Sequence, residues 1–304
     1  MKRILVTGAG GYIGRYCMPM LLEAGFEVHG TGRSDVSPNF LPKGASWHGA
    51  DLLHADGCAN LMMKVRPTHL LNLAWYTEHG SFWNAPENLQ WVQTGAELMR
   101  LFVKYGGERF VGAGSCAEYD WHYGYLTEAM TPRNAWSPFG RFKNSLFELS
   151  STYAALSDIS FAWGRIYFLY GPHEKETRLV ASVIKSLLSG KPARSSAGTQ
   201  IRDFSNVKDV AKAFVELTVS PVTGALNIAS GIPVTVRSVV EKIGSVIGRP
   251  ELLHIGAMPM VENDPPMLLA DVRRLYGEVG FKPTFDLVGG LEDTVSYYRE
   301  HGFS

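Results

Sequence analysis

The residues Thr7-Gly8-Ala9-Gly10-Gly11-Tyr12-Ile13-Gly14 decide the fold of this chain. They follow a short apolar run that begins at Ile4, and an amphipathic stretch over 13–24 continues from them. Glycines three residues apart allow a sharp strand-to-helix turn and let a phosphate approach the bare backbone and the free N–H groups at the helix start. The turn therefore predicts a dinucleotide pyrophosphate site made by Thr7, Gly8, Gly11, Tyr12, Ile13 and Gly14. A tight turn without a ligand is the alternative.

The pattern beyond this turn predicts a doubly wound parallel sheet of the Rossmann type, because short apolar runs alternate with longer amphipathic stretches. We expect strands near 4–7, 27–31, 46–49, 69–72, 109–112 and 160–166, and helices near 13–24, 56–65, 89–105 and 140–155. After Gly171-Pro172 the alternation loosens, and helices near 178–188, 207–218, 236–247 and 287–300 are separated by Gly/Pro-rich connectors. We expect residues 1–171 to bind the dinucleotide and residues 172–304 to form mainly a smaller substrate lobe, with some return of the chain to the first domain.

Composition argues against several classes of partner. Lysine plus arginine balance aspartate plus glutamate at 29 each in 304 residues, so no net field favours nucleic acid or an anionic membrane. The three cysteines, Cys17, Cys58 and Cys116, lack the spacing of a metal site or a disulfide framework. The apolar run at the N-terminus is too short for a signal peptide or a membrane span. We expect a cytoplasmic protein without a metal.

The end of the second strand indicates which dinucleotide is bound. NAD-binding proteins of this type place an acidic residue there to hold the ribose 2′-hydroxyl. This chain has Gly32, Arg33 and Ser34 instead, which leaves room and a positive charge for a 2′-phosphate. NADP(H) is therefore favoured and NAD(H) is the alternative, as is a solvated role for Arg33. Asp51 and Leu52, which close the third strand, are placed to meet the adenine.

Further motifs occur in order along most of the chain, and together they resemble those of the extended short-chain dehydrogenases/reductases that act on nucleotide sugars. That family includes UDP-galactose 4-epimerase and dTDP-glucose 4,6-dehydratase. The resemblance implies that Leu73, Ala74, Trp75 and Tyr167 contact the cofactor. The motifs are Thr7–Gly14, Asn72-Leu73-Ala74, Ser115-Cys116-Ala117-Glu118-Tyr119, Phe139-Gly140-Arg141-Phe142-Lys143, Gly164-Arg165 before Tyr170-Gly171-Pro172, Arg202-Asp203-Phe204 before Val207-Lys208-Asp209-Val210, and Gly280-Phe281-Lys282-Pro283.

The family's catalytic group is a tyrosine four residues before a lysine, with a serine or threonine upstream. Lys143 and Ser115 match the lysine and the serine, but Phe139 stands in the tyrosine position. The spacing of four places 139 and 143 on one helix face, where an ammonium lowers a phenol pKa. Phenylalanine has the ring without the hydroxyl, so it cannot transfer a proton.

Three explanations of Phe139 remain open at this point. Phe139 is a deliberate replacement of tyrosine that traps a substrate, or the protein naturally uses another acid, or it binds nucleotides without chemistry. The other acids available near this motif are Tyr119, His122, Tyr123 and Tyr167.

The residues after Ser115 bear on the reaction. The dehydratases of the family have two acidic residues there, whereas this chain has Cys116 and Ala117, so a 4,6-dehydratase is disfavoured. Glu118, one position later, is better explained as a structural loop carboxylate. An NADP-type pocket favours NADPH-dependent reduction of a keto group, at C4 of a nucleotide-linked deoxy sugar. A nucleotide-sugar 4-epimerase and a non-catalytic NADP-binding sensor or scaffold are the alternatives.

The resemblance also implies a substrate site and a dimer. The sequence around Arg202 resembles the family's diphosphate-binding strand, although a buried arginine paired with Asp203 is an equal alternative. Phe168 stands where the family often has an asparagine, which leaves the usual phosphate contact in doubt. The resemblance implies a homodimer through the helices near 89–105 and 140–155. The remaining predicted substrate contacts are Tyr76, Ser115, Cys116 and Arg178, with the nearby aromatic residues Trp75, Trp83, Trp91 and Trp121 as stacking or core residues.

Overall fold

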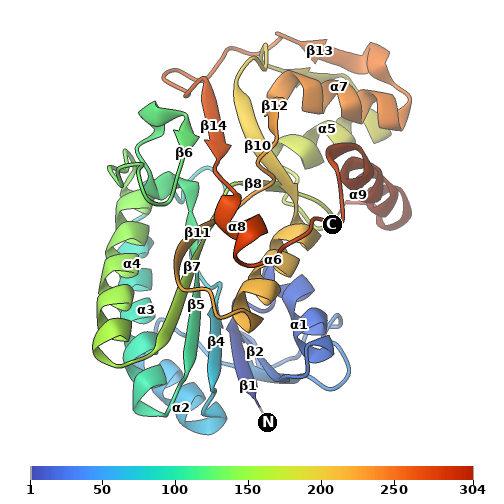
Figure 1. Cartoon of the computed structure of the whole chain (residues 1–304). Helices are drawn as coiled ribbons and strands as arrows, with labels where there is room; N and C mark the ends of the chain where they lie inside the picture. The colour runs from blue at the N-terminus through green and yellow to red at the C-terminus, as the bar shows by residue number, and fades with distance from the viewer. Residues whose placement is uncertain (1, 304) are drawn as a thin grey trace.

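In the computed structural model, which describes residues 2–303, seven parallel strands form the main sheet. Their order is β11-β7-β5-β4-β1-β2-β3. The chain adds β2 and β3 on one side of β1 and then crosses over to add β4, β5, β7 and β11 on the other side, as in a doubly wound Rossmann sheet. Figure 1 shows this sheet in the lower part of the molecule, with a second lobe above the carboxyl ends of its strands. The strands are β1 (Arg3–Thr7), β2 (Glu27–Gly32), β3 (Ser46–Gly49), β4 (His69–Asn72), β5 (Arg109–Ser115), β7 (Ser160–Ile166) and β11 (Gly224–Ile228).

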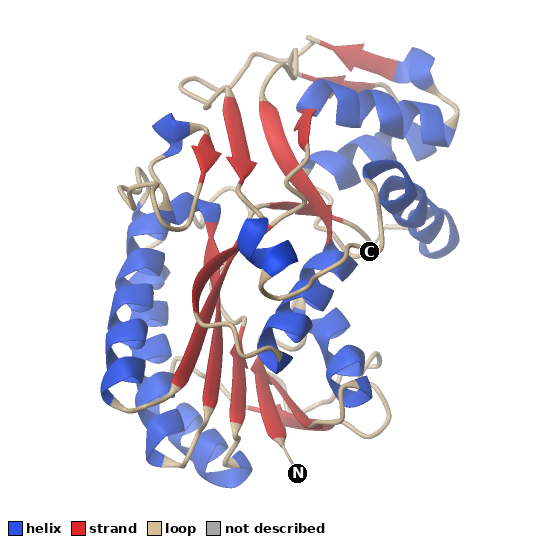
Figure 2. Cartoon of the chain, viewed as in Figure 1, coloured by secondary structure: helices blue, strands red, loops and turns tan. Residues whose placement is uncertain are grey.

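The central strands are apolar because helices cover both faces of the sheet. Helices α1 and α6 pack together on one face, and α2, α3 and α4 cover the other (Figures 1 and 2). The predicted fold class is confirmed, and β11 is a strand that the sequence reasoning did not place. The helices are α1 (Gly14–Glu23), α2 (Ala55–Val65), α3 (Glu87–Lys104), α4 (Pro138–Leu156) and α6 (Val207–Val219).

The upper lobe is built from short elements. The strand β10 (Ile201–Asn206) pairs with β12 (Pro233–Thr235), β14 (Met267–Ala270) and β8 (Phe168–Tyr170), and β14 also pairs with β6 (Tyr125–Leu126). These strands were not predicted, because most have two to four residues and lie between turns. The other elements are β9 (Ala193–Ser195), β13 (Leu253–Ile255), α5 (Leu179–Leu188), α7 (Val236–Ile247), α8 (Arg273–Gly277), α9 (Leu287–His301) and the 3₁₀ turns η1 (Cys116–Glu118), η2 (Trp121–Tyr123) and η3 (Pro250–Leu252).

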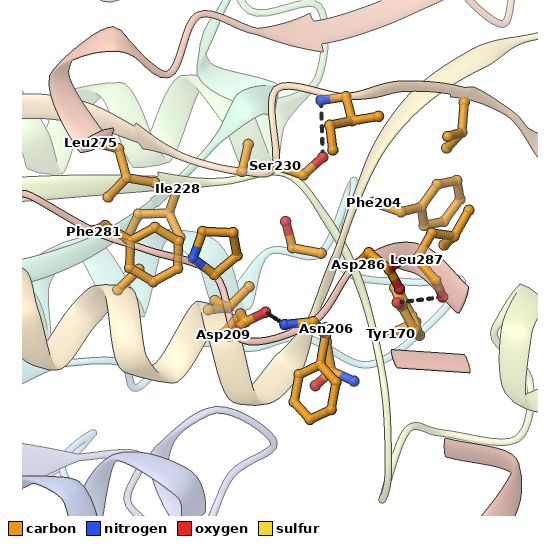
Figure 3. Close-up of a pocket in the computed structure, with 18 of the residues that line it drawn as sticks. Tyr170, Phe204, Asn206, Asp209, Ile228, Ser230, Leu275, Phe281, Asp286 and Leu287 are labelled. Atoms are coloured by element: carbon orange, nitrogen blue, oxygen red, sulfur yellow. Dashed lines mark hydrogen bonds between the residues drawn. The ribbon is translucent and has the colours of Figure 1, made fainter. Parts of the chain in front are cut away.

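A small cavity of about 40 Å³ lies where α6 meets β8, β10 and the C-terminal segment. Figure 3 shows Asn206, Asp209 and Tyr170 around it, with the Tyr170 hydroxyl donating to the Leu287 carbonyl at 3.3 Å. None of its lining residues belongs to the predicted site. The cavity has room for water only. In sheets of this type, ligands bind instead at the carboxyl ends of the main strands.

Within residues 2–303, Cys17, Cys58 and Cys116 are free and buried, and no cluster of His, Cys, Asp or Glu is arranged to hold a metal ion. None of the helices described in this range is long and apolar enough to cross a membrane.

Candidate active site

The glycine turn joins β1 to α1 and leans against the end of β4. Gly8 has φ +67°, which favours glycine, and a methyl group built on it would stand 3.0 Å from the Ala74 nitrogen. A methyl group on Gly14 would stand 2.2 Å from the Gly8 carbonyl oxygen. Within residues 2–303, no side chain caps the start of α1 at Ile13. The bare turn and the uncapped N–H groups fit the pyrophosphate of a dinucleotide.

Side chains fasten this turn to its neighbours. The Thr7 hydroxyl donates to Asn72 Oδ1 at 2.6 Å and accepts from the Ala74 N–H at 3.2 Å, which joins the ends of β1 and β4. The Tyr12 hydroxyl donates to the Gly171 carbonyl at 3.2 Å, and burial raises the pKa of this phenol well above its usual range. Tyr12 therefore spans from the turn to the start of the upper lobe.

The predicted adenosine residues lie at the ends of β2 and β3. Arg33 is exposed, and Ser34 follows it. Asp51 is exposed and accepts the Leu53 N–H at 3.1 Å, whereas Leu52 is buried. Trp47, which the sequence reasoning did not select, lies among these residues because its indole N–H donates to the Ser34 carbonyl at 2.9 Å.

Ser115 ends β5 and caps the turn η1. Its hydroxyl accepts the Ala117 N–H at 3.2 Å, and its own N–H donates to Glu118 Oε1 at 2.8 Å. The helix α4 comes very close to this turn, because a methyl group on Gly140 would stand 2.0 Å from the Ala117 carbonyl oxygen. The structure thereby brings Ser115 beside the helix that carries Phe139 and Lys143.

Glu118 is fully buried and pairs with Arg165, whose Nε donates to Oε2 at 2.6 Å. The Trp163 indole donates to the same carboxylate at 3.0 Å. This carboxylate has no free side on which to remove a proton from a sugar. The structure therefore agrees with the structural explanation of Glu118.

Lys143 is buried at the centre of the site. Its Nζ donates to the Ala113 carbonyl on β5 at 2.8 Å and lies 3.8 Å from the centre of the Trp75 ring. Burial lowers the pKa of Lys143 to about 7, and the charge of Glu118 opposes that change. The ammonium is held by a carbonyl on one side and an aromatic face on the other.

Phe139 is buried in an aromatic cluster made by three chain segments. Its ring meets Phe82 and Trp83 edge-on, at centroid distances of 4.9 and 5.7 Å, and its N–H donates to the Trp83 carbonyl at 3.0 Å. Trp83 also packs against Trp121 and Trp136 at 5.9 and 5.3 Å. The sequence did not predict Phe82 and Trp136 as site residues, because neither belongs to a recognisable motif.

The four alternative acids differ in their surroundings. The Tyr119 hydroxyl is used inside the fold, since it donates to Asn227 at 2.8 Å and accepts from Arg165 at 3.0 Å. His122 and Tyr123 are exposed on η2, and the His122 ring pairs with Asp120 at 2.7 Å. Tyr167 is buried beside Cys116, and its hydroxyl has no hydrogen-bond partner among residues 2–303. Of the four, only Tyr167 is both buried and unpaired within that range.

Arg202, a predicted substrate contact on β10, is already paired. Its guanidinium donates to Asp264 at 2.5 Å and to the Pro265 carbonyl at 2.8 Å, and it stacks near the Phe168 ring at 5.4 Å. Asp203, the partner considered from the sequence, instead accepts from Ser230 and Gly231. A diphosphate at Arg202 would therefore compete with Asp264.

The remaining substrate candidates lie on three segments: Tyr76 in the loop between β4 and α3, Arg178 at the start of α5 and Cys116 on η1. Tyr76 bonds to Ser81 at 3.1 Å within that loop, and Glu78 pairs with Lys175 of the upper lobe at 2.6 Å. Arg178 stands half-buried at the start of α5, and Cys116 is buried, with its thiol pKa raised to about 12 by burial. The Glu78–Lys175 pair shows that the loop between β4 and α3 reaches across to the upper lobe.

This chain is similar to known proteins whose names include nucleotide sugars. A curated relative, dTDP-6-deoxy-L-talose 4-dehydrogenase (NAD(+)) of Aggregatibacter actinomycetemcomitans, is 27% identical over 79% of this chain and 88% of its own length. CDP-abequose synthase of Salmonella typhimurium is 24% identical over 95% of this chain and 96% of its own length. The solved structure of MoeE5 with UDP-glucuronic acid and NAD is 28% identical, covers 98% of this chain and 99% of that one, and superposes with a TM-score of 0.82.

The family profile extends over most of the main domain. It matches residues 4–229, a range that begins in β1 and ends just after β11. The glycine turn, Ser115 and the Phe139/Lys143 pair all lie inside it. The chain belongs to the NAD dependent epimerase/dehydratase family.

Proposed function

We propose that this chain binds NADPH and a nucleotide-linked deoxy sugar, and that its site is built to reduce a keto group at C4 of that sugar. The observation that carries the proposal is the convergence of Ser115, the Phe139 position and Lys143 at the carboxyl end of β5. The names of two relatives, a dTDP-6-deoxy sugar 4-dehydrogenase and a CDP-abequose synthase, support a nucleotide-sugar substrate. The first of these names includes NAD(+), so the NADP preference rests on Gly32 and Arg33 alone.

Each residue has a defined task in this proposal. NADPH, when bound, supplies the hydride. Lys143 presents an ammonium towards the cofactor ribose, and the Ser115 hydroxyl, whose oxygen accepts the Ala117 N–H, uses its own proton to donate to the sugar oxygen. Conversion of the oxygen to an alcohol also needs a proton, which Phe139 cannot supply, so in this chain the alkoxide takes its proton from water. Positioned proton transfer contributes about a hundred- to ten-thousand-fold, so turnover is slow by about that factor.

The surroundings of Phe139 bear on why it is there. Phe82, Trp83 and Trp75 surround the ring with aromatic edges and faces, a setting that suits a ring without a hydroxyl. A ring that is held by aromatic contacts and carries no hydroxyl supports the second candidate function, a nucleotide-binding protein without chemistry.

The test is Phe139→Tyr, with Phe139→Leu as the control that also lacks a hydroxyl. Loss of NADPH absorbance with a keto-sugar nucleotide should rise at least a hundredfold in Phe139→Tyr and stay low in Phe139→Leu. Silence of Phe139→Tyr with intact NADPH binding would favour the binding protein. Sugar conversion without net NADPH consumption would favour the epimerase.

A further inference from the structure

The indole of Trp47 occupies the space beside the carboxyl end of β2. A methyl group built on Gly32 would stand 2.6 Å from Cζ2 of that indole, which is closer than real atoms approach. A methyl group on Gly10, in the glycine turn, would stand 3.4 Å from the indole Cη2. The ring therefore bridges the turn and the end of β2, and its N–H bond to the Ser34 carbonyl holds it there.

This position matters because the adenosine ribose of a dinucleotide binds outside the carboxyl end of the second strand, next to the glycine turn. An acidic side chain at that strand end accepts the ribose 2′-hydroxyl of NAD. Here any side chain on residue 32 would collide with the Trp47 ring. The indole thus makes glycine necessary at 32 and removes the place for a carboxylate.

The first acidic residue after β2 is displaced as well. A methyl group built on Gly49 would stand 2.1 Å from Asp35 Oδ1 and 2.7 Å from the Asp35 nitrogen. Asp35 therefore lies over the end of β3, one strand further from the glycine turn than β2. Arg33 remains exposed beside Gly32, so the charge nearest the strand end is positive.

We propose that Trp47 is the residue that determines dinucleotide selectivity in this chain: its indole forms the floor of the adenosine subsite and excludes a carboxylate, which leaves Arg33 to meet a 2′-phosphate. This inference rests on the dinucleotide binding contained in the proposed function. It does not depend on the sugar, on the reaction or on Phe139.

The experiment measures the dissociation constants of NADP⁺ and NAD⁺ by calorimetry on the full chain. Trp47→Ala should weaken both by roughly tenfold, because the aromatic floor is lost. Gly32→Asp alone should weaken both without favouring NAD⁺, because the indole leaves no room for the carboxylate. Gly32→Asp combined with Trp47→Ala should favour NAD⁺ by about tenfold or more, since the carboxylate then has space to accept the ribose 2′-hydroxyl. Val36→Ala, on the same exposed loop, should change neither constant.

Trp47→Phe keeps a ring in the space and should retain the wild-type preference, which separates selectivity from loss of folding. Circular dichroism melts identify any variant that is unfolded. Unchanged constants in Trp47→Ala would overturn the inference, as would a switch to NAD⁺ by Gly32→Asp alone. Binding of neither dinucleotide to the unchanged protein would overturn both this inference and the proposed function. If the selectivity variants behave as expected but Phe139→Tyr shows no activity, the proposed reaction would be wrong and the inference about Trp47 would stand.

Discussion

The Lys143 ammonium lies 3.8 Å from the centre of the Trp75 ring, and the same ring meets Phe139 edge-on at 6.4 Å. Trp75 is held in place because its indole N–H donates to Asn88 Oδ1 at 2.8 Å. The aromatic face stabilises the charged form of the lysine in a buried setting, and the same ring packs against the side chain at 139.

Trp75→Leu tests whether the Trp75 ring stabilises the Lys143 ammonium. The variant keeps an apolar side chain but removes the π face, which is worth about 0.5–2 kcal/mol to a cation. We expect the pKa of Lys143 to fall by about one pH unit. Titration of ¹³C-methylated lysines by NMR measures it, with the Lys143 signal assigned from Lys143→Arg. A pKa that stays the same or rises in Trp75→Leu would show that the ring does not hold the ammonium.

The buried amine also predicts a pH-dependent stability. Burial lowers the pKa of Lys143 to about 7 in the folded protein, whereas an unfolded lysine titrates near about 10.4. Between these values the unfolded chain binds the proton and the folded chain does not, so the lysine lowers stability below about pH 7 and this cost disappears as the pH rises.

Lys143→Met removes the titrating group. The variant should be more stable than the unchanged protein. This gain in the free energy of unfolding should be on the order of 3 kcal/mol larger near pH 6.5 than near pH 10. Urea unfolding of both proteins at the two pH values measures this difference. An equal gain at both would mean that the lysine titrates normally.

The Glu118 and Arg165 pair gives a prediction for stability. Glu118 and Arg165 side chains are 0% and 1% exposed. Glu118→Ala leaves a buried guanidinium without its counter-charge, and we expect a loss of about 3–5 kcal/mol in unfolding free energy. Glu118→Ala with Arg165→Met should recover much of that loss. If the single variant cost less than about 1 kcal/mol in urea unfolding, the pair would not be structural.

Tyr167 has a buried hydroxyl without a partner among residues 2–303. Tyr167→Phe should therefore leave the unfolding free energy unchanged or raise it by about 1 kcal/mol, while weakening dinucleotide binding roughly fivefold through a lost hydrogen bond. Thermal melts and calorimetry on the same variant separate the two effects. A large loss of stability with unchanged affinity would make the hydroxyl structural.

Exposed leucines on α3 and α4 support a dimer. Leu89, Leu149 and Leu156 are 51%, 53% and 81% exposed on these helices, which pack side by side. We expect the protein to sediment as a homodimer and Leu149→Glu combined with Leu156→Glu to sediment as a monomer, because the charges oppose burial. Val219→Glu, at a 50% exposed position on α6, is the matched control and should stay dimeric. A monomeric unchanged protein would contradict the prediction.

Local patterns explain which features could be predicted. The strands at 46–49, 69–72 and 160–166 have the predicted bounds, because alternation and turn residues act over a few positions. β11 could not be found in this way, since Gly224–Ile228 is short and becomes a strand only beside β7.

The sequence by itself determined the Rossmann sheet, the phosphate-binding turn and the absence of a hydroxyl four residues before Lys143, because these depend on neighbours along the chain. Tertiary structure alone decided that Trp75 covers the ammonium, that Trp47 fills the space beside Gly32, and that Arg202 pairs with Asp264 rather than Asp203. These contacts join residues distant in sequence, and only the packing of elements brings such side chains within reach of each other.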